Sequence, residues 1–274
     1  MLLRRRAAAL RKSTGKAIYT QHELSSPPLA KRLAASITRP TYLLFTEPVL
    51  IASTCWSAFS FGTVFLFTQS VEQVFGELYG WGPYSASYVQ GAVVIGELIG
   101  WPVAAYGSHL WLKSAKSNVE TPGRPIPEAR LYVSVPASFL GIVGGMLVYA
   151  WTSYPTIHWM APAIGLAMVG FGIQVVVTAV ADYITDAYAP SGYAGSAVSA
   201  VAAGENVVAA FLPLAAKSLY GNLGLHWAST LLAGLAFVLG FAPVLFIWKG
   251  RWFRAQSPFM QDGKEASEKD AATP

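Results

Sequence analysis

The sequence predicts an all-helical (all-α), polytopic membrane protein that crosses the bilayer six times. Of its 274 residues, 54% are hydrophobic and only 12% are charged, whereas a soluble domain carries about 25% charged residues. The mean hydropathy is +0.43. Six apolar stretches follow one another, each with roughly the 20 residues that a helix needs to cross the hydrocarbon core. We expect the lipid bilayer as a partner and no nucleic acid.

The stretches divide the chain into three parts. We expect a basic cytoplasmic tail over 1–46, a six-helix transmembrane domain over 47–249 and a cytoplasmic C-terminal tail over 250–274. The expected spans lie at about 48–67, 87–106, 131–150, 159–181, 194–219 and 227–248.

The first part is rich in Lys and Arg and carries Leu2, Leu3 and Leu10 among its arginines. This pattern fits a short amphipathic helix on anionic headgroups, and it fits a solvated linker equally well. The apolar run near Met1 is too short for the core of a secretory signal. We therefore expect the start of the chain to be a cytoplasmic tail.

The distribution of basic residues predicts the orientation in the membrane. The loop at 70–84 has no Lys or Arg, whereas the loop at 107–130 has four. Basic loops stay cytoplasmic, so the first loop is expected outside and the second inside. The loop at 182–192 has no basic residue and is placed inside by parity alone, and Lys217 lies on the unfavoured side. Both termini are then cytoplasmic.

Glycines recur within the spans at the spacing of close helix packing. Gly96 and Gly100 form one small-xxx-small pair, and Gly141 and Gly145 form another. Such pairs let two helix backbones approach closely in lipid. We interpret them as packing positions.

Two glutamates, Glu97 in the second span and Glu205 in the fifth, lie deep within apolar stretches. A carboxylate at membrane depth costs several kcal/mol unless it is paired, protonated or facing water. Such residues often mark ion or substrate paths, although a structural hydrogen-bond network between helices is the alternative. We expect Glu97 and Glu205 to bind protons, a cationic substrate, or each in turn.

Other polar or aromatic residues could line the same path. Gln90 stands seven positions before Glu97 and shares its helix face, and Asn206 follows Glu205 directly. A single amide or tryptophan within a span more often serves packing. The further candidates for substrate or proton binding are Gln90, Gln174, Asn206 and Trp56.

Catalysis finds no support in the sequence. The four histidines fall in tails or at span ends, and there is no HExxH or Walker A motif. No spacing typical of metal ligands occurs, and the single cysteine, Cys55, cannot form an internal disulfide. We expect no enzyme activity, no cofactor and no metal.

Several short segments resemble a known family in their order and spacing. They are PEARLY at 127–132, IHW at 157–159, YITDAY at 183–188, and PL and WAS at 213–214 and 227–229. Together they resemble the C-terminal half of fungal drug:proton antiporters of the major facilitator superfamily, in the polyamine and multidrug resistance branch. One departure is Glu205, where many such proteins carry an arginine.

This resemblance implies a fold and a function. The family has twelve helices in two halves around a central cavity, so the six spans would be helices seven to twelve. The first, second, fourth and fifth spans would line the cavity, and the plasma membrane would be the location. The expected function is proton-coupled export of drugs, polyamines or other small molecules.

The resemblance leaves the first six helices without a counterpart in this chain. Alternating access rocks one half against the other, so a half needs a partner. The partner could be a separate N-terminal six-helix half or a second copy of this chain. The alternative is a truncated, non-transporting membrane fragment or an interaction subunit.

Overall fold

The computed structural model describes residues 6, 7, 10–13, 15, 29–118, 123–257, 259 and 260. The chain forms two compact units, Met1–Thr41 and Tyr42–Pro274, and each is described by itself. The amphipathic pattern at Leu2 and Leu3 lies outside the described residues. So does most of the expected tail at 250–274, from residue 261 onward.

Helix α3, Leu29–Thr46, occupies the end of the region predicted to be a basic tail. Its threonine hydroxyls donate to backbone oxygens one turn earlier: Thr38 to Ala34 at 2.9 Å and Thr41 to Ile37 at 2.8 Å. Pro40 lies inside the helix, where it has no N–H to donate. Part of the expected tail is therefore regular helix.

The first two spans begin at prolines. Helix α4, Pro48–Gln73, continues into a π-helical turn, η1, Val74–Leu78. A short helix α5, Pro83–Tyr88, leads to α6, Gly91–Ser114. Proline is preorganised for the first helical position and has no N–H that would need a partner there. These boundaries extend the predicted first and second spans by one to three turns at their C-terminal ends.

The third span is irregular. It consists of the 3₁₀ turn η2, Pro127–Leu131, the short α7, Ser134–Pro136, the π-helical η3, Ala137–Val143, and α8, Gly144–Thr152. Pro136 cannot donate a backbone hydrogen bond, and local π geometry is one way in which a helix absorbs that loss. The span is therefore continuous in direction but not in hydrogen-bond pattern.

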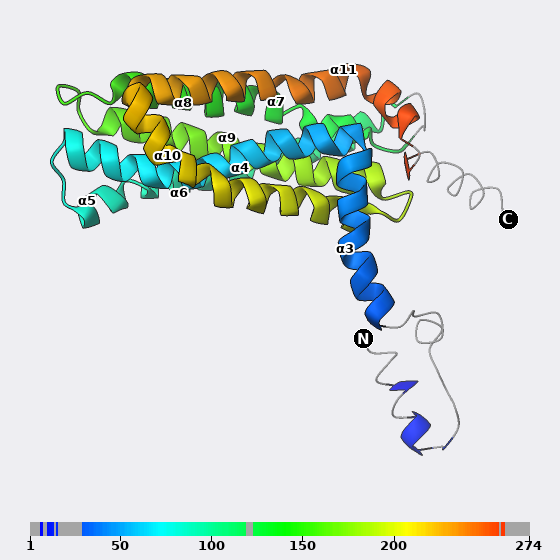
Figure 1. The fold of residues 1–274 in the computed structure, drawn as a ribbon. Helices are drawn as coiled ribbons and strands as arrows, with labels where there is room; N and C mark the ends of the chain where they lie inside the picture. Colours follow the sequence, from blue (N-terminus) through cyan, green and yellow to red (C-terminus); the bar gives the residue numbers. More distant parts are fainter. Residues whose placement is uncertain are drawn as a thin grey trace. The chain divides into compact units, whose positions relative to one another are not determined.

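The last three spans follow as α9, Met160–Tyr188, α10, Ala194–Leu239, and α11, Phe241–Gln256. α10 contains one residue with non-helical geometry, Gly224, at φ 74° and ψ 165°. This left-handed φ suits glycine, which has no Cβ. The chain reverses direction near it: in Figure 1 the yellow segment runs along the lower edge of the bundle and the orange segment returns along the upper edge. α10 therefore supplies the fifth span and the start of the sixth.

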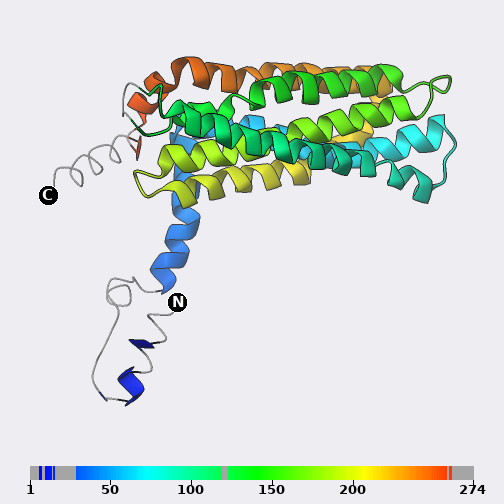
Figure 2. The same ribbon diagram turned by 180° about the vertical axis from the view of Figure 1, so that it is seen from behind.

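Five continuous helical segments in the described residues are long and apolar enough to span a membrane, and the last of them has 63 residues. Because that segment contains the reversal at Gly224, it supplies two spans. The helices of the second unit run roughly parallel or antiparallel to one another in both ribbon views (Figures 1 and 2). The predicted fold class, an all-helical, multi-pass membrane protein with six spans, is confirmed.

Glycines allow two backbones to touch. A Cβ added to Gly96 of α6 would lie 1.9 Å from the carbonyl oxygen of Ala167 on α9, and one on Gly170 would lie 2.3 Å from that of Val93. Gly141 of η3 approaches the Cα of Gly172 in the same way, at 2.8 Å. The prediction that these glycines serve packing is confirmed.

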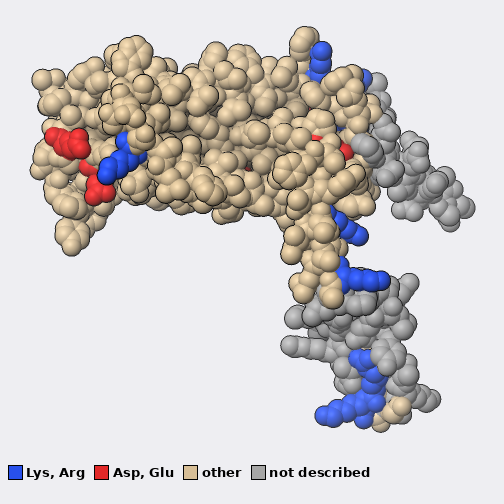
Figure 3. Space-filling view, in the orientation of Figure 1, with Lys and Arg blue, Asp and Glu red and all other residues tan. Residues whose placement is uncertain are grey.

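Large apolar side chains also cover much of the outside of the second unit. Leu98 and Trp101 on α6 are each 69% exposed, and Phe211 on α10 is 67% exposed. Charged side chains are sparse over the helices and gather toward the two ends of the bundle in Figure 3. Such a surface suits hydrocarbon, whose interior offers no water to charged groups.

Candidate functional site

Glu205 lies at the contact between α4 and α10. The Ser57 hydroxyl on α4 donates a hydrogen bond to Oε1 of Glu205. Ser57 is fully buried and Glu205 is partly buried. One turn away, Thr54 packs so close to Gly204 that a Cβ there would lie 2.3 Å from its Cγ2. The small residue before Glu205 thus lets α4 approach closely enough for this bond.

Thr54 adds a second polar group beside this contact. Its side chain is 7% exposed, and its hydroxyl has no hydrogen-bond partner among the described residues. A buried hydroxyl without a partner costs about 1 to 3 kcal/mol. The α4–α10 contact therefore combines a carboxylate, one bonded hydroxyl and one unbonded hydroxyl.

Two neighbouring candidates have different surroundings. Trp56 is buried, at 1% exposure, and its indole Nε1 donates to the hydroxyl of Ser138 at 3.0 Å. Asn206 is exposed and donates to the carbonyl of Ala202 in its own helix at 2.7 Å. Trp56 thus holds α4 against η3, whereas Asn206 presents its amide oxygen at the surface of this unit.

Glu97 lies on the other helix pair, α6 and α9. It is partly buried and makes no hydrogen bond or ion pair within the described part of the chain. Gln174 of α9 lies against α6, since a Cβ on Gly100 would lie 3.0 Å from its Cβ. The Gln174 amide donates to the Thr178 hydroxyl at 3.3 Å. Glu97 and Gln174 thus lie on two helices, α6 and α9, that are in close contact.

Gln90 links α6, the helix that carries Glu97, to α4, the helix that contacts Glu205. It is the N-cap residue of α6 rather than an interior one. Its side-chain amide donates to the backbone oxygen of Thr68 on α4, at 3.4 Å. α6 is thereby joined to α4 at the end opposite to Ser114.

The structure does not join all six candidates into one cluster. Glu205, Asn206 and Trp56 belong to the α4–α10 region, and Glu97 and Gln174 belong to the α6–α9 region. No hydrogen bond or ion pair between Glu97 and Glu205 occurs in the described residues. Within the same residues, no three His, Cys, Asp or Glu side chains gather as metal ligands.

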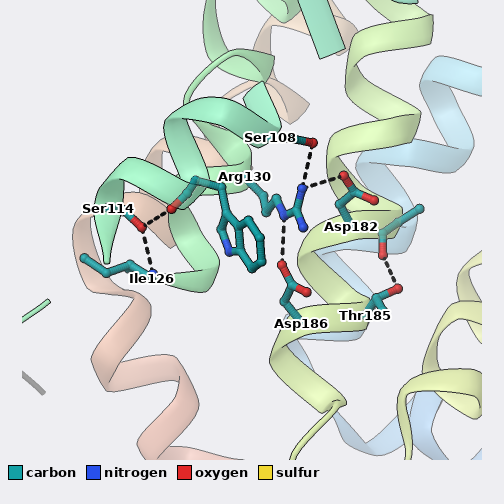
Figure 4. Close-up of polar contacts among 9 residues, drawn as sticks. Ser108, Ser114, Ile126, Arg130, Asp182, Thr185 and Asp186 are labelled. Atoms are coloured by element: carbon teal, nitrogen blue, oxygen red, sulfur yellow. Dashed lines mark hydrogen bonds and ion pairs between the residues drawn. The ribbon is translucent and has the colours of Figure 1, made fainter. Parts of the chain in front are cut away.

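A cluster that sequence reasoning missed lies at one end of the bundle. The Arg130 guanidinium in η2 bonds Asp186 through Nε at 2.8 Å and Asp182 through Nη1 at 3.1 Å, both on α9 (Figure 4). Its Nη1 also donates to the Ser108 hydroxyl on α6 at 2.8 Å. The guanidinium lies 3.8 Å from the ring centroid of Trp111. One side chain therefore connects η2, α6 and α9.

Further polar contacts gather at this end. The Ser114 hydroxyl donates to the backbone oxygen of Trp111 at 2.6 Å and accepts from the Ile126 N–H at 2.8 Å, as Figure 4 shows. Nη1 of Arg254, at the end of α11, donates to Glu128 in η2. These bonds hold the segment around η2 to the ends of α6 and α11.

The ends of α4 and α9 meet here too. The Tyr188 hydroxyl donates to Oε2 of Glu47, the N-cap residue of α4, at 3.2 Å, and both side chains are buried. Because α9 continues to Tyr188, residues 182–188 are helical and not part of the predicted 182–192 loop. The sequence did contain a signal: Arg130 and the Asp182–Asp186 pair occur in two segments that were both predicted on the cytoplasmic side.

These features define a multi-pass helical membrane protein with carboxylates inside its spans, and sequence comparison gives the relatives of this class. The chain is 31% identical over 240 residues to the "Major facilitator-type transporter sor6" of Hypocrea jecorina, covering 87% of the chain and 43% of that relative. It is 32% identical over 262 residues to the "Major facilitator superfamily multidrug transporter FLU1" of Candida albicans, with 94% and 42% covered. It is 32% identical over 262 residues to the "MFS transporter cpaT" of Aspergillus oryzae, with 94% and 51% covered.

The chain is therefore homologous, over nearly all of its length, to fungal major facilitator transporters. It spans about half the length of the curated relatives it matches. These relatives are transporters and not enzymes, which agrees with the expectation that the chain is not an enzyme. No protein-family model matches the chain. No solved structure matches it either.

Proposed function

We propose that this chain is the C-terminal half, helices seven to twelve, of a proton-coupled exporter in the drug:proton antiporter branch. Its substrates would be drugs, polyamines or other small molecules. The observation that carries the proposal is the contact of Ser57 with Glu205, a carboxylate inside the membrane-spanning bundle. A multidrug transporter and an efflux pump among the relatives support the same class of function.

In this proposal, Glu205 takes up and releases the coupled proton. An intramembrane carboxylate needs a partner, a proton or water. Ser57 can donate to the ionised form and accept from the protonated form, since a hydroxyl does both. The contact therefore accommodates both states of Glu205 without leaving the carboxyl group unpartnered.

Glu97 has the complementary role in the proposal. Without a bonding partner in the described residues, its carboxylate is free to attract a cationic substrate. Gln174, Gln90 and Asn206 supply amide groups that can bind polar parts of a substrate. Trp56 supports the site indirectly, because its hydrogen bond with Ser138 holds α4 in place.

Transport needs a second wall for the cavity. We propose that a six-helix N-terminal half completes it, with a second copy of this chain as the competing arrangement. Alternating access requires two halves that rock around a common site. The exposed apolar faces of α6 and α10 are compatible with such a partner. In this proposal both termini are cytoplasmic and the assembly lies in the plasma membrane.

The test is co-expression in an efflux-deficient yeast strain with the N-terminal half of the Candida albicans relative. We expect drug tolerance only when both halves are present. Glu205→Gln should abolish the dependence of efflux on external pH, because an amide carries no titratable proton. Glu97→Gln should reduce tolerance to cationic drugs more than to neutral ones.

Glu265→Gln removes a carboxylate from the C-terminal segment and is the matched control, with tolerance unchanged. If no partner half restores tolerance, the alternative of a non-transporting fragment or interaction subunit gains. If the chain alone gives tolerance and migrates as a dimer, the second-copy arrangement replaces the two-half one. An unchanged pH profile in Glu205→Gln would contradict the assigned proton role.

A further inference from the structure

A cavity with a volume of about 390 Å³ lies where the first span ends and α5 begins. Small-molecule sites have volumes of roughly 300 to 1,000 Å³. Its walls carry two carboxylates, two carboxamides and an indole, from Glu72, Glu77, Gln69, Gln73 and Trp81. Acidic side chains gather at the same end as α5 in the space-filling view, and a basic side chain lies beside them (Figure 3). The cavity is separate from the Ser57–Glu205 contact, which lies several turns earlier on α4.

The π-helical turn η1, Val74–Leu78, shapes this cavity. Glu72 and Glu77 stand five positions apart, and in a regular α-helix of 3.6 residues per turn they would point to different sides. A π turn has more residues per turn because its bonds run from i to i+5. It rotates Glu77 back toward the side of Glu72. π turns are frequent at functional sites, and this one brings two carboxylates to one cavity.

Trp81 forms a wall that other aromatic rings hold in place. Its ring centroid lies 5.5 Å from that of Phe75 and 5.4 Å from that of Trp159. The neighbouring Tyr79 hydroxyl donates to the backbone oxygens of Tyr154 at 3.2 Å and Ile157 at 3.0 Å. Burial raises the pKa of Tyr79, so the hydroxyl stays protonated and remains a donor. These contacts therefore fix the position of the Trp81 indole before any ligand binds.

The two carboxylates at the cavity stabilise no contact within the described part of the fold. Glu72 and Glu77 make no hydrogen bond or ion pair with the part of the chain that the structure describes. The lining contains no Lys or Arg. Lys217 lies toward the same side of the membrane in the predicted orientation but does not line the cavity. The cavity thus offers negative charge and an aromatic face, with no basic group to hold an anion.

We propose that this cavity binds an organic cation of the quaternary ammonium class. The carboxylates of Glu72 and Glu77 would balance the charge, and the Trp81 ring would contact the alkyl groups by a cation–π interaction. Gln69 and Gln73 would bind a polar substituent of the cation. The positive-inside distribution places the site on the non-cytoplasmic face. The proposal concerns binding alone and does not depend on transport by this chain.

The test is saturation-transfer NMR on the full chain in dodecyl maltoside micelles, which contain no choline headgroups. The probes are choline and its neutral isostere 3,3-dimethylbutan-1-ol. We expect choline to bind at least tenfold more tightly than the alcohol. The double variant Glu72→Gln/Glu77→Gln should weaken choline about tenfold, the sum of two exposed charge pairs. Trp81→Leu should weaken it about threefold, with Trp81→Phe retaining part of the affinity.

Two controls make the result specific. Glu265→Gln removes a carboxylate elsewhere, and Trp252→Leu removes an exposed tryptophan at the opposite end of the unit. Neither should alter choline affinity by more than twofold. Equal binding of choline and the alcohol would mean apolar partition only and would overturn the proposal. So would a loss of choline binding in Glu97→Gln or Glu205→Gln with none in the Glu72→Gln/Glu77→Gln double variant, because the cation would then occupy the interior of the bundle.

Discussion

The hydroxyl of Ser57 donates to the carboxylate of Glu205 across 148 positions of sequence, joining the first span to the fifth. Both belong to the most extensive helix contact of the second unit, that of α4 with α10. We expect Ser57→Ala to lower the free energy of unfolding by about 1 to 3 kcal/mol, since the partly buried carboxylate loses its donor. Titration of the purified chain with sodium dodecyl sulfate measures this loss.

Ser199→Ala is the matched control for that change. The Ser199 hydroxyl is exposed and donates only to Gly195 in its own helix. Its loss should alter stability by less than about 0.5 kcal/mol. Equal stability of Ser57→Ala and the unsubstituted chain would show that solvent replaces the serine at Glu205.

Arg130→Ala should be among the more destabilising single changes at its end of the bundle. It removes ion pairs with Asp182 and Asp186 and the contact with Trp111. The expected loss is about 2 to 4 kcal/mol, because the Arg130 side chain is only 14% exposed while that of Asp182 is 40% exposed. Detergent-titration unfolding gives the value.

Arg130→Lys distinguishes shape from charge at the same position. A lysine keeps the positive charge but cannot bond two carboxylates with a planar fork. We expect it to recover less than half of the loss in Arg130→Ala. Full recovery would mean that charge alone stabilises this contact.

Gly96→Ala tests the close approach of α6 to α9. The added methyl would lie 1.9 Å from the oxygen of Ala167, so the helices must separate. We expect a loss of about 1 to 3 kcal/mol or more, as for other overpacked sites. The control, Gly234→Ala, adds a methyl group with no heavy atom within 4 Å in the same kind of structure. Helix propensity should make the control neutral or stabilising by up to about 1 kcal/mol.

Cysteine labelling tests the orientation. In a Cys55→Ala background, Tyr84→Cys should react with a membrane-impermeant maleimide in intact yeast cells. Tyr84 is 87% exposed and lies in the short helix α5, which contains no basic residue. Lys116→Cys should react only after permeabilisation. The reverse pattern would place the basic loop outside and contradict the predicted topology.

The number and order of the spans could be predicted because roughly 20 apolar residues are a direct physical requirement of the bilayer. The residues at which the spans end were harder to predict. Asp182 and Asp186 were predicted to lie in a loop, yet α9 continues to Tyr188, and Arg130 pairs with both of them. Hydropathy cannot distinguish a helix that leaves the hydrocarbon from a loop. The partner that stabilises such an end is known only from the fold.

The candidate site was predictable to a similar extent. Glu97 and Glu205 were found because a carboxylate among apolar residues is costly. Ser57 was missed, since a serine in a membrane helix is ordinary and nothing local identifies its partner. Trp56 was correctly placed in the first span, but only the structure reveals its bond to Ser138. Local sequence thus identifies unusual residues but not the pairs that they form.

The glycine contacts between α6 and α9 restrict how this bundle can move. Gly96 lies against Ala167, and Gly170 against Val93, with room in each place only for a hydrogen atom. A shift of one helix along the other by a single residue would press a side chain into a peptide group. The two helices must therefore move together as one rigid unit. Any change that opens or closes a path through the membrane has to bend or slide elsewhere.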